Sequence, residues 1–446
     1  MKRSLFILLT HLFFLEAKEL FTPEKISDYL IESNPYISTI KNREKVAKEK
    51  IGFYQGAFDT TLSAKYDDKE YPASTGEYSE FFVKKKIENG LELSTGYRRA
   101  EGTQELNNIK TGKSGEMLLG VKIPVIAMIK GVNSHKRDLD IAKIDGIKYE
   151  YNSENGLRLL NFEIFRSYYT LIYRKAILNF EKELLEKAQE RQSFVENRVK
   201  VGSLPELSNI EVEQQIIGRE QRLFVATTDY ENSFTDFLRY LNISKNEFNS
   251  RYRLTDILDV SIEDFKFKDA LETAKENRPD LKMLEFDKDK LLIDRKTADL
   301  LKYPKLNLSL YGVHDLKYGN GFKVSIGMDF PVERSRYESK IGQFRENLEN
   351  IDQTKRKKLI EIEASIRNII ESLKILKLNI ENADREIKLV KRLEDAENRK
   401  YRVGSSNLFL LNQREIYSLN TQKKILQYKL NYILLKEQLK AQMGVI

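Results

Sequence analysis

Histidine and cysteine, the residues most often used for catalysis and metal binding, are scarce in this chain. It has no cysteine, and its three histidines, His11, His135 and His314, are far apart in the sequence. Thiol catalysis, thiolate metal ligands and disulfides all require cysteine. A Ser-His-Asp set or a histidine metal site requires a histidine beside suitable partners. We therefore expect no catalytic residue, no metal site and no cofactor.

Two other features could indicate an enzyme: paired carboxylates and a phosphate-binding loop. Glu211 and Glu213 lie two positions apart in a segment with helical periodicity, and positions i and i+2 of a helix do not face each other. The sequence also has no glycine-rich phosphate-binding loop. An enzyme is therefore the least favoured class.

Composition favours a folded protein with extensive solvated surface. The chain has 446 residues, of which 41% are apolar and 32% charged, with net charge +8 and pI about 9.0. Acidic and basic residues are interleaved, and the basic run Lys355-Arg356-Lys357-Lys358 is short. Such a run is typical of a solvated helix face, so we expect no nucleic-acid partner.

The N-terminal segment resembles a secretory signal peptide over residues 1–17. Lys2 and Arg3 precede an apolar stretch at 4–15, and Ala17 is suitable before a cleavage site, although Leu15 is large for the −3 position. The alternative is a buried N-terminal helix. No later stretch approaches eighteen apolar residues, so we expect no transmembrane helix. An exported chain without one is soluble, surface-associated or a β-barrel.

The elements that organise the chain are long helices in segments without proline, 125–204 and 332–446. The second segment carries an unbroken 3-4 spacing typical of a coiled-coil seam. The seam consists of Leu359, Ile362, Ile366, Ile369, Leu373, Leu376, Ile380, Ala383, Ile387 and Val390. The first segment has a looser version of the pattern, and one helix over 130–199 would be about 100 Å long.

Both predicted rods end at the same tripeptide, Val-Gly-Ser, at 201–203 and at 403–405. Gly202 and Gly404 can adopt the left-handed conformation that ends a helix. Ser208 with Glu211 would form a capping box for the first return helix, and Ser406 or Asn407 would cap the second. We therefore expect two helical hairpins, with return helices over about 209–241 and 408–442.

The two halves of the sequence repeat one another beyond these tips. "FTPEKISDYLIESNPYI" at 21–37 aligns with "FKFKDALETAKENRPDL" at 265–281, which pairs Phe21 with Phe265 and Pro35 with Pro279. Each proline is predicted to end a short helix and to begin a longer one, over 36–55 and 280–301. The order of short helix, helix, strands, long helix, turn and return helix then recurs.

Strand-like sequence lies between these helices. Apolar residues alternate strictly with polar ones over 322–332, at Phe322, Val324, Ile326, Met328, Phe330 and Val332. This pattern is typical of a membrane-spanning strand and equally of a half-buried strand in a soluble sheet. The first half has about four such segments against two in the second, and a hairpin around Asn89-Gly90 resembles an insertion.

Together these features predict an internally duplicated α+β membrane protein with long helical hairpins and β-strands that contribute to an oligomeric barrel. We expect a first repeat over 18–245, with strands at about 58–126, a hairpin at about 130–241 and its tip near 200–207. The second repeat covers 246–446, with strands at about 305–332, a hairpin at about 336–442 and its tip near 402–408. Lipid does not tolerate open strand edges, so several copies must close one barrel.

The sequence resembles the TolC-like outer membrane efflux protein family over nearly the whole chain after the signal peptide. The residues that carry the resemblance are "SNPYI" and "NRPDL", "KIPV" from Lys122, "DFPV" from Asp329, and the two Val-Gly-Ser tips. The resemblance implies a homotrimer with a barrel among the lipids of the outer membrane and a helical tunnel across the periplasm. It also implies a periplasmic adaptor and an inner-membrane transporter as partners, and passive export in efflux or type I secretion.

The resemblance also suggests roles for particular residues. It places adaptor docking at the residues of the two tips, Val201, Gly202, Ser203, Val403, Gly404 and Ser405. These residues could equally serve only to close the helices. Some relatives narrow the second tip with aspartates, but 409–413 has no acidic residue, so Phe409 or Leu410 could form an apolar constriction or could be seam residues. Four strands per copy, the family norm, would give a twelve-stranded barrel, and six would give eighteen.

Two other classes compete with the channel. A periplasmic adaptor has one helical hairpin between compact β domains, whereas two hairpins are predicted here. A coiled-coil scaffold in the cytoplasm would keep its N-terminus and fractionate as a soluble protein. The sequence does not identify the exported substrate or the cognate pump.

Overall fold

The structure, a computed structural model, describes residues 18–72, 74–102 and 113–445. The predicted signal peptide at 1–17 lies outside the described residues. The chain forms two compact units. The tip unit comprises the chain up to Thr39, Leu157–Asn277 and the residues from Ile362 onward. The sheet unit comprises Ile40–Gly156 and Arg278–Glu361.

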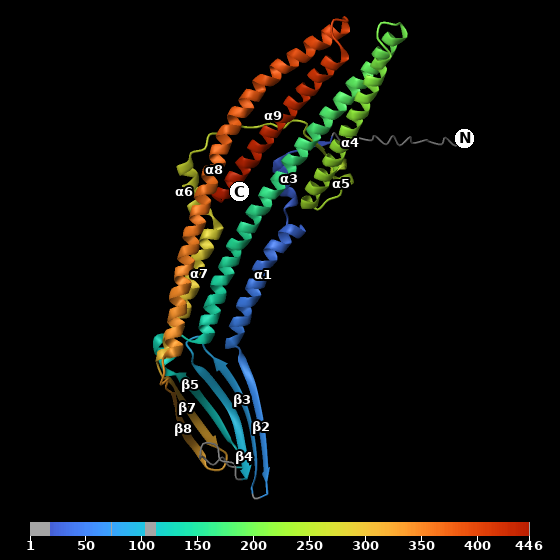
Figure 1. The fold of residues 1–446 in the computed structure, drawn as a ribbon. Helices are drawn as coiled ribbons and strands as arrows, with labels where there is room; N and C mark the ends of the chain where they lie inside the picture. Colours follow the sequence, from blue (N-terminus) through green and yellow to red (C-terminus); the bar gives the residue numbers. More distant parts are fainter. Residues whose placement is uncertain (1–17, 73, 103–112, 446) are drawn as a thin grey trace, which may run out of the picture. The chain divides into compact units, whose positions relative to one another are not determined.

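Long helices and one antiparallel sheet make up most of the described chain (Figure 1). The helices are η1 Pro23–Tyr29, α1 Pro35–Gln55, η2 Gly56–Phe58, α2 Val125–Lys130, α3 Ser134–Lys200, α4 Leu207–Leu241, α5 Lys245–Arg251, α6 Phe267–Asn277, α7 Pro279–Ala298, η3 Asp299–Lys302, α8 Ser335–Arg402 and α9 Leu408–Met443. The strands are β1 Glu19–Phe21, β2 Thr60–Tyr71, β3 Ser74–Lys86, β4 Glu92–Gly102, β5 Glu116–Pro124, β6 Tyr252–Leu254, β7 Lys305–Asp315 and β8 Gly319–Asp329.

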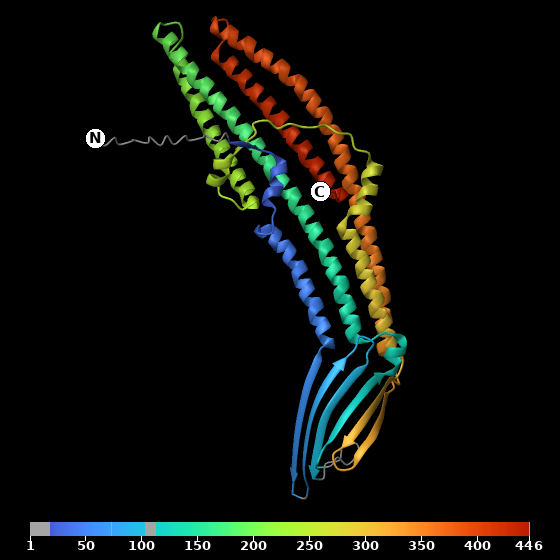
Figure 2. The same cartoon turned by 180° about the vertical axis from the view of Figure 1, so that it is seen from behind.

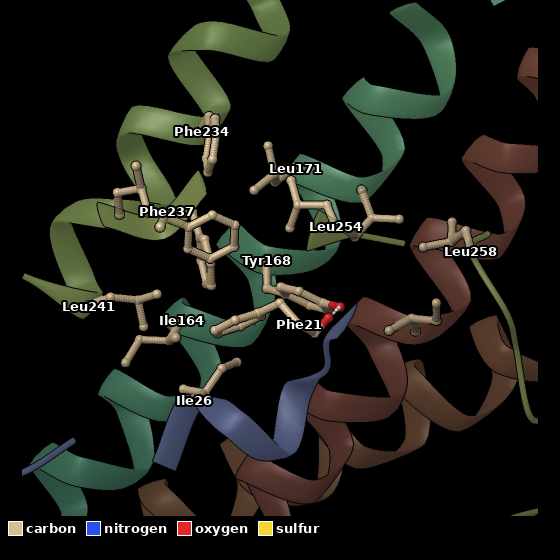
Figure 3. Close-up of a cluster of buried hydrophobic side chains, with 14 of the residues drawn as sticks. Phe21, Ile26, Ile164, Tyr168, Leu171, Phe234, Phe237, Leu241, Leu254 and Leu258 are labelled. Atoms are coloured by element: carbon tan, nitrogen blue, oxygen red, sulfur yellow. Dashed lines mark hydrogen bonds between the residues drawn. The ribbon is translucent and has the colours of Figure 1, made fainter. Parts of the chain in front are cut away.

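The core of the tip unit is an aromatic cluster around Phe21, which is fully buried (Figure 3). Its ring lies 5.6 Å from that of Phe237 in a T-shaped arrangement and 5.1 Å from that of Phe248. Aromatic pairs of this kind contribute about 0.5–1.5 kcal/mol each beyond the area they bury. The Tyr168 hydroxyl donates a hydrogen bond to the Phe21 carbonyl at 3.1 Å. This carbonyl belongs to β1, which pairs in parallel with β6.

In the sheet unit, six strands pair in the order β2-β3-β4-β5-β7-β8, and every neighbouring pair is antiparallel (Figure 2). The pairing of β5 with β7 joins the strands of the first half of the sequence to those of the second. Four strands come from the first half and two from the second, as the alternation predicted. The expected turn at Asn89-Gly90 joins β3 to β4, and Gly90 has the positive φ of 95° that such turns favour.

Two prolines begin helices, as the sequence predicted. Pro35 is the first residue of α1 and Pro279 the first of α7. In the sheet unit, Arg278 donates two hydrogen bonds of 2.9 Å to the carboxylate of Asp280, and Lys358 on α8 donates a third of 2.9 Å. Burial alone would raise the pKa of Asp280, but these hydrogen bonds outweigh it and hold the pKa below its usual range.

Two details of the predicted helices differ from the structure. The first rod begins at Ser134 rather than at 130, because Gly131 adopts a left-handed conformation (φ 66°) that ends α2. The predicted capping box of Ser208 and Glu211 is wrong. Helix α4 already begins at Leu207 after Pro205, its N-cap residue is Glu206, and that residue makes no side-chain cap. The second cap is confirmed, since the Asn407 side chain accepts a hydrogen bond from the Leu410 amide at 2.9 Å.

Candidate functional site

One face of the six-stranded sheet is apolar and exposed. Register places apolar or small side chains next to one another across all six strands, in the row Leu62, Val83, Thr95, Leu119, Gly312 and Phe322. Leu119 is 69% exposed and Phe322 is 85% exposed. A sheet of this kind in water would normally bury such a row against a second layer.

The opposite face of the same sheet carries charged and polar side chains, several of which are buried. Arg98 and Glu116 form an ion pair between β4 and β5, and each is only 7% exposed. The Tyr78 hydroxyl donates a hydrogen bond of 2.5 Å to Glu80 along β3. The apolar face of the sheet is therefore exposed, whereas charged side chains on the opposite face are buried together with Phe82 and Leu118. Exposed apolar rows with buried charges reverse the usual pattern of a water-soluble protein.

The alternation predicted at 322–332 is present in β8. Phe322, Val324, Ile326 and Met328 are exposed on the apolar face. Strand β8 ends at Asp329, so Phe330 and Val332 lie beyond it, although both are exposed as well.

The two Val-Gly-Ser tips lie in the tip unit and have the same local geometry. Gly202 (φ 70°) and Gly404 (φ 81°) are left-handed, as predicted. The amide of Ser203 donates to the Arg198 carbonyl at 2.8 Å, and that of Ser405 donates to the Lys400 carbonyl at 2.9 Å. Each serine hydroxyl donates to that same carbonyl, at 3.0 and 3.2 Å respectively. Thus glycine supplies the turn, and serine satisfies the last carbonyls of the helix.

The valine of each tip has no such structural task. Val201 is 77% exposed and Val403 is 78% exposed. The tips are held instead by a small apolar cluster that joins both hairpins, made of Val195, Val212, Tyr401, Leu408 and Leu411. The exposed valines are therefore free to contact another molecule.

A buried charge network lies near the tips and was not predicted. Glu415 on α9 accepts hydrogen bonds from Arg191 on α3 and, at 2.7 Å, from Arg219 on α4. Arg219 is fully buried and also donates to the Leu184 carbonyl at 2.5 Å and to Asn412 at 2.9 Å. Burial lowers the pKa of the Arg219 guanidinium, and the charge of Glu415 opposes that shift. The network links α3, α4 and α9.

The sequence does contain a pattern that points to this network, in the regular spacing of residues along the helix seams. Val212, Arg219 and Ala226 follow one another at intervals of seven residues and are all buried on α4. Leu408, Leu411, Glu415 and Ser418 follow a 3-4-3 spacing and are all buried on α9. A charged residue at a seam position of a coiled coil is a known device for fixing helix register. Reading Arg219 and Glu415 as seam residues would therefore have located the network.

Two hollows lie beside the tips. One, of about 590 Å³, lies between α3 and α8 and is lined by residues that include Lys187, Arg191, Glu394 and Tyr401. The other, of about 330 Å³, lies between α4 and α9 and includes Phe409 in its lining. Phe409 and Leu410, the predicted constriction residues, are 62% and 41% exposed, so neither belongs to the apolar cluster of the tips.

The histidines of the described chain serve separate local contacts. His135 lies 3.3 Å from the Lys86 ammonium, and His314 lies 2.7 Å from Asn320. Over residues 18–72, 74–102 and 113–445, no cluster of His, Asp or Glu is arranged to hold a metal ion. None of the helices in this described part is long and apolar enough to cross a membrane.

The fold is that of bacterial outer membrane channels. No family model and no curated protein matches the sequence. Among solved structures, the CmeC outer membrane channel of Campylobacter jejuni has 14% identity and a TM-score of 0.70, covering 95% of this chain and 85% of that chain. The outer membrane protein VceC of Vibrio cholerae has 12% identity and a TM-score of 0.71, covering 95% and 96%. The open state of the Neisseria gonorrhoeae MtrE outer membrane channel has 10% identity and a TM-score of 0.69, covering 95% and 89%.

These comparisons cover nearly the whole chain at low identity, so the likeness is one of fold. The resemblance to TolC-like outer membrane proteins is confirmed at that level. The chain combines the long helical hairpins and the antiparallel sheet of such channels in one polypeptide.

Proposed function

We propose that the chain is the exit duct of an export system in the outer membrane of a didermic bacterium. It would conduct substrates passively across the periplasm and outer membrane, in tripartite efflux or type I secretion, and would perform no catalysis itself. The observation that carries the proposal is the reversed sheet, in which Leu119 and Phe322 are exposed whereas Arg98 and Glu116 are buried. Lipid outside and water inside is the environment that satisfies both faces.

An oligomer follows from the edges of the sheet. An open strand edge leaves backbone donors and acceptors without partners, and each costs several kcal/mol in hydrocarbon. One copy has two such edges, at β2 and β8, so copies must pool their strands into a closed wall. We infer a homotrimer, in line with the family that the sequence resembles, with the two repeats of each copy contributing one hairpin each to a helical tunnel.

The tips are the proposed docking points for a periplasmic adaptor, which an inner-membrane transporter would serve. Val201 and Val403 offer apolar contacts, while the glycine and serine of each tip hold the turn in shape. The hollow between α3 and α8 and the hollow between α4 and α9 lie in the same hairpins and could receive helices of a partner.

Phe409 and Leu410 are the proposed apolar constriction of the tunnel entrance. Both are exposed in the single chain, so they are available to face their counterparts in other copies. Replacing Phe409 by alanine should raise the closed-state conductance in a planar bilayer. An unchanged conductance would count against the constriction.

Fractionation of a didermic host that expresses the full chain tests the main proposal. We expect the protein in the outer membrane fraction, extractable only with detergent, as a heat-modifiable trimer on a gel. A stable water-soluble monomer obtained without detergent would overturn it.

Docking is tested separately at the valines. Val201→Asp and Val403→Asp should abolish capture of a periplasmic adaptor from the same bacterium, because each places a charge on an apolar contact without touching the apolar cluster of the tips. Val403→Thr, which keeps the shape, is the matched control. If the aspartate variants bind the adaptor like the parent chain, the tips only close the helices.

A further inference from the structure

The β3–β4 hairpin is an additional pair of strands. In the second half of the sequence, β7 follows a helix and β8 leads into "DFPV", which begins at its last residue, Asp329. In the first half, β2 follows a helix and β5 leads into "KIPV", ending at Pro124. This matches β2 with β7 and β5 with β8. Strands β3 and β4 then have no counterpart among the described residues.

This hairpin is an integral part of the wall. Strand β3 pairs with β2 from Thr60↔Lys85 to Tyr71↔Ser74, and β4 pairs with β5 from Glu92↔Lys122 to Arg98↔Glu116. Its turn is also fixed to the beginning of α3, since the Asn133 amide donates to the Glu88 carbonyl at 2.7 Å. A flap lying over the sheet would have neither set of contacts.

The two outer edges of the sheet fit one another. Five successive antiparallel pairings make β8 run opposite to β2, and the two strands have similar lengths of 11 and 12 residues. Both are exposed on the apolar face, through Leu62 and Tyr66 on β2 and through Phe322 and Ile326 on β8. Strand β8 of one copy can therefore pair with β2 of the next while the apolar face continues.

The charged inner face sets a lower limit on the number of strands. Barrels of about eight strands are filled by side chains, whereas barrels of about 16–18 leave a water channel. Arg98, Glu116 and Lys323 all belong to the inner face and require water or charged partners there. One copy gives six strands, fewer than the number that side chains already fill, whereas the three copies inferred above give eighteen, a number that leaves a water channel.

We propose that three copies close an eighteen-stranded barrel through β2–β8 pairing. In this barrel, β3 and β4 of each copy are the additional strands that widen the wall. This rests on the proposed function, because it assumes that the sheet lies in a membrane. Barrel diameter grows roughly linearly with strand number, so the lumen would be about one and a half times as wide as that of a twelve-stranded barrel. The membrane section would then admit solutes wider than a twelve-stranded wall allows.

Disulfide cross-linking tests this closure. Because the sequence has no cysteine, only the introduced cysteines can form disulfides. Ala64→Cys on β2 would be combined in turn with Phe322→Cys, Val324→Cys or Ile326→Cys on β8. One combination should give, after oxidation in the membrane, a covalent ladder that ends at three chains. Ala64→Cys with Thr95→Cys, two strands away within the sheet, is the control and should give no ladder. A ladder that ends at two chains, or none from any combination, would overturn the closure.

Cryo-electron microscopy of the detergent-solubilised channel counts the strands directly. We expect eighteen in the parent chain and twelve after deletion of residues 74–102. Twelve strands in the parent chain would overturn the inference, even if the deletion variant did not fold. A water-soluble monomer would refute the proposed function as well, whereas a membrane trimer with twelve strands would refute the eighteen-stranded barrel alone.

Discussion

The tip unit and the sheet unit follow opposite rules of burial. In the tip unit, Phe21 and Phe237 are inside, and most charges outside the Glu415 network are on the surface. In the sheet, Phe322 is exposed and the Arg98–Glu116 pair is buried. The hydrophobic effect acts only where water is the alternative, so this contrast agrees with the proposed function, in which the sheet meets lipid and the helices meet water.

The largest expected effect tests the water-facing half of this contrast. Phe237→Ala removes a ring that lies 5.6 Å from Phe21 in the buried cluster. Truncation of a buried phenylalanine costs about 3–5 kcal/mol, so the helical signal should be lost at clearly lower denaturant. Circular dichroism of the detergent-solubilised protein would measure this, and an unchanged midpoint would contradict the assigned core.

The next effect distinguishes the two faces of one strand. Ile326→Arg places a charge on the exposed apolar face of β8, and Ser325→Arg places the same charge on the opposite face. In a bilayer the first should cost about 2–4 kcal/mol and the second little. Urea unfolding from liposomes compares them, and equal losses would remove the distinction between a lipid face and a lumen face.

A smaller effect depends on pH and concerns the charges that tie α7 to α8. The lowered pKa of Asp280 means that its stabilisation is complete above the ordinary carboxyl pKa of about 3.9 and is lost as the pH falls through the lower folded value. Asp280→Asn should therefore cost about 1.5–3 kcal/mol at pH 7, with the deficit shrinking below pH about 4. A deficit that stays constant down to pH 2, measured by denaturant midpoints, would argue against this ion cluster.

The smallest effect compares two glycines of the tip unit. Gly404→Ala forces a left-handed residue to carry a side chain and should cost about 1–2 kcal/mol. Gly218→Ala, inside α4 with open space around it, should instead stabilise by roughly 0.5–1 kcal/mol. Thermal midpoints of both variants measure the difference, and destabilisation by both would mean that the tip conformation is not the cause.

Local sequence rules predicted the elements that depend on local chemistry. Gly202 and Gly404 end their helices, Pro35 and Pro279 begin theirs, and the seam from Leu359 to Val390 is buried or half-buried in α8. The alternation on β8 predicted its apolar face. Each of these depends on conformational limits or on a period that neighbours in the sequence already define.

Features that depend on pairing between distant segments could not be predicted in the same way. The expected cap at Ser208 was wrong, because α4 already begins at Leu207 and so places Ser208 inside the helix. Strand candidates could be counted, but only the register of β3 and β4 shows that both belong to the same sheet. The spacing of Arg219 and Glu415 marks them as seam residues, but only the packing of α3 beside α4 and α9 shows that Arg191 joins them.

The cluster around Phe21 has a consequence for the timing of folding. It joins a residue near the beginning of the chain to Phe248 in the middle and to Leu430 and Ile433 near the end. Contacts of such long sequence separation form slowly, since a large loop must close before any of them stabilises the chain. The core of the tip unit therefore cannot be completed until the last helix, α9, is available, even where other parts of the chain have already folded.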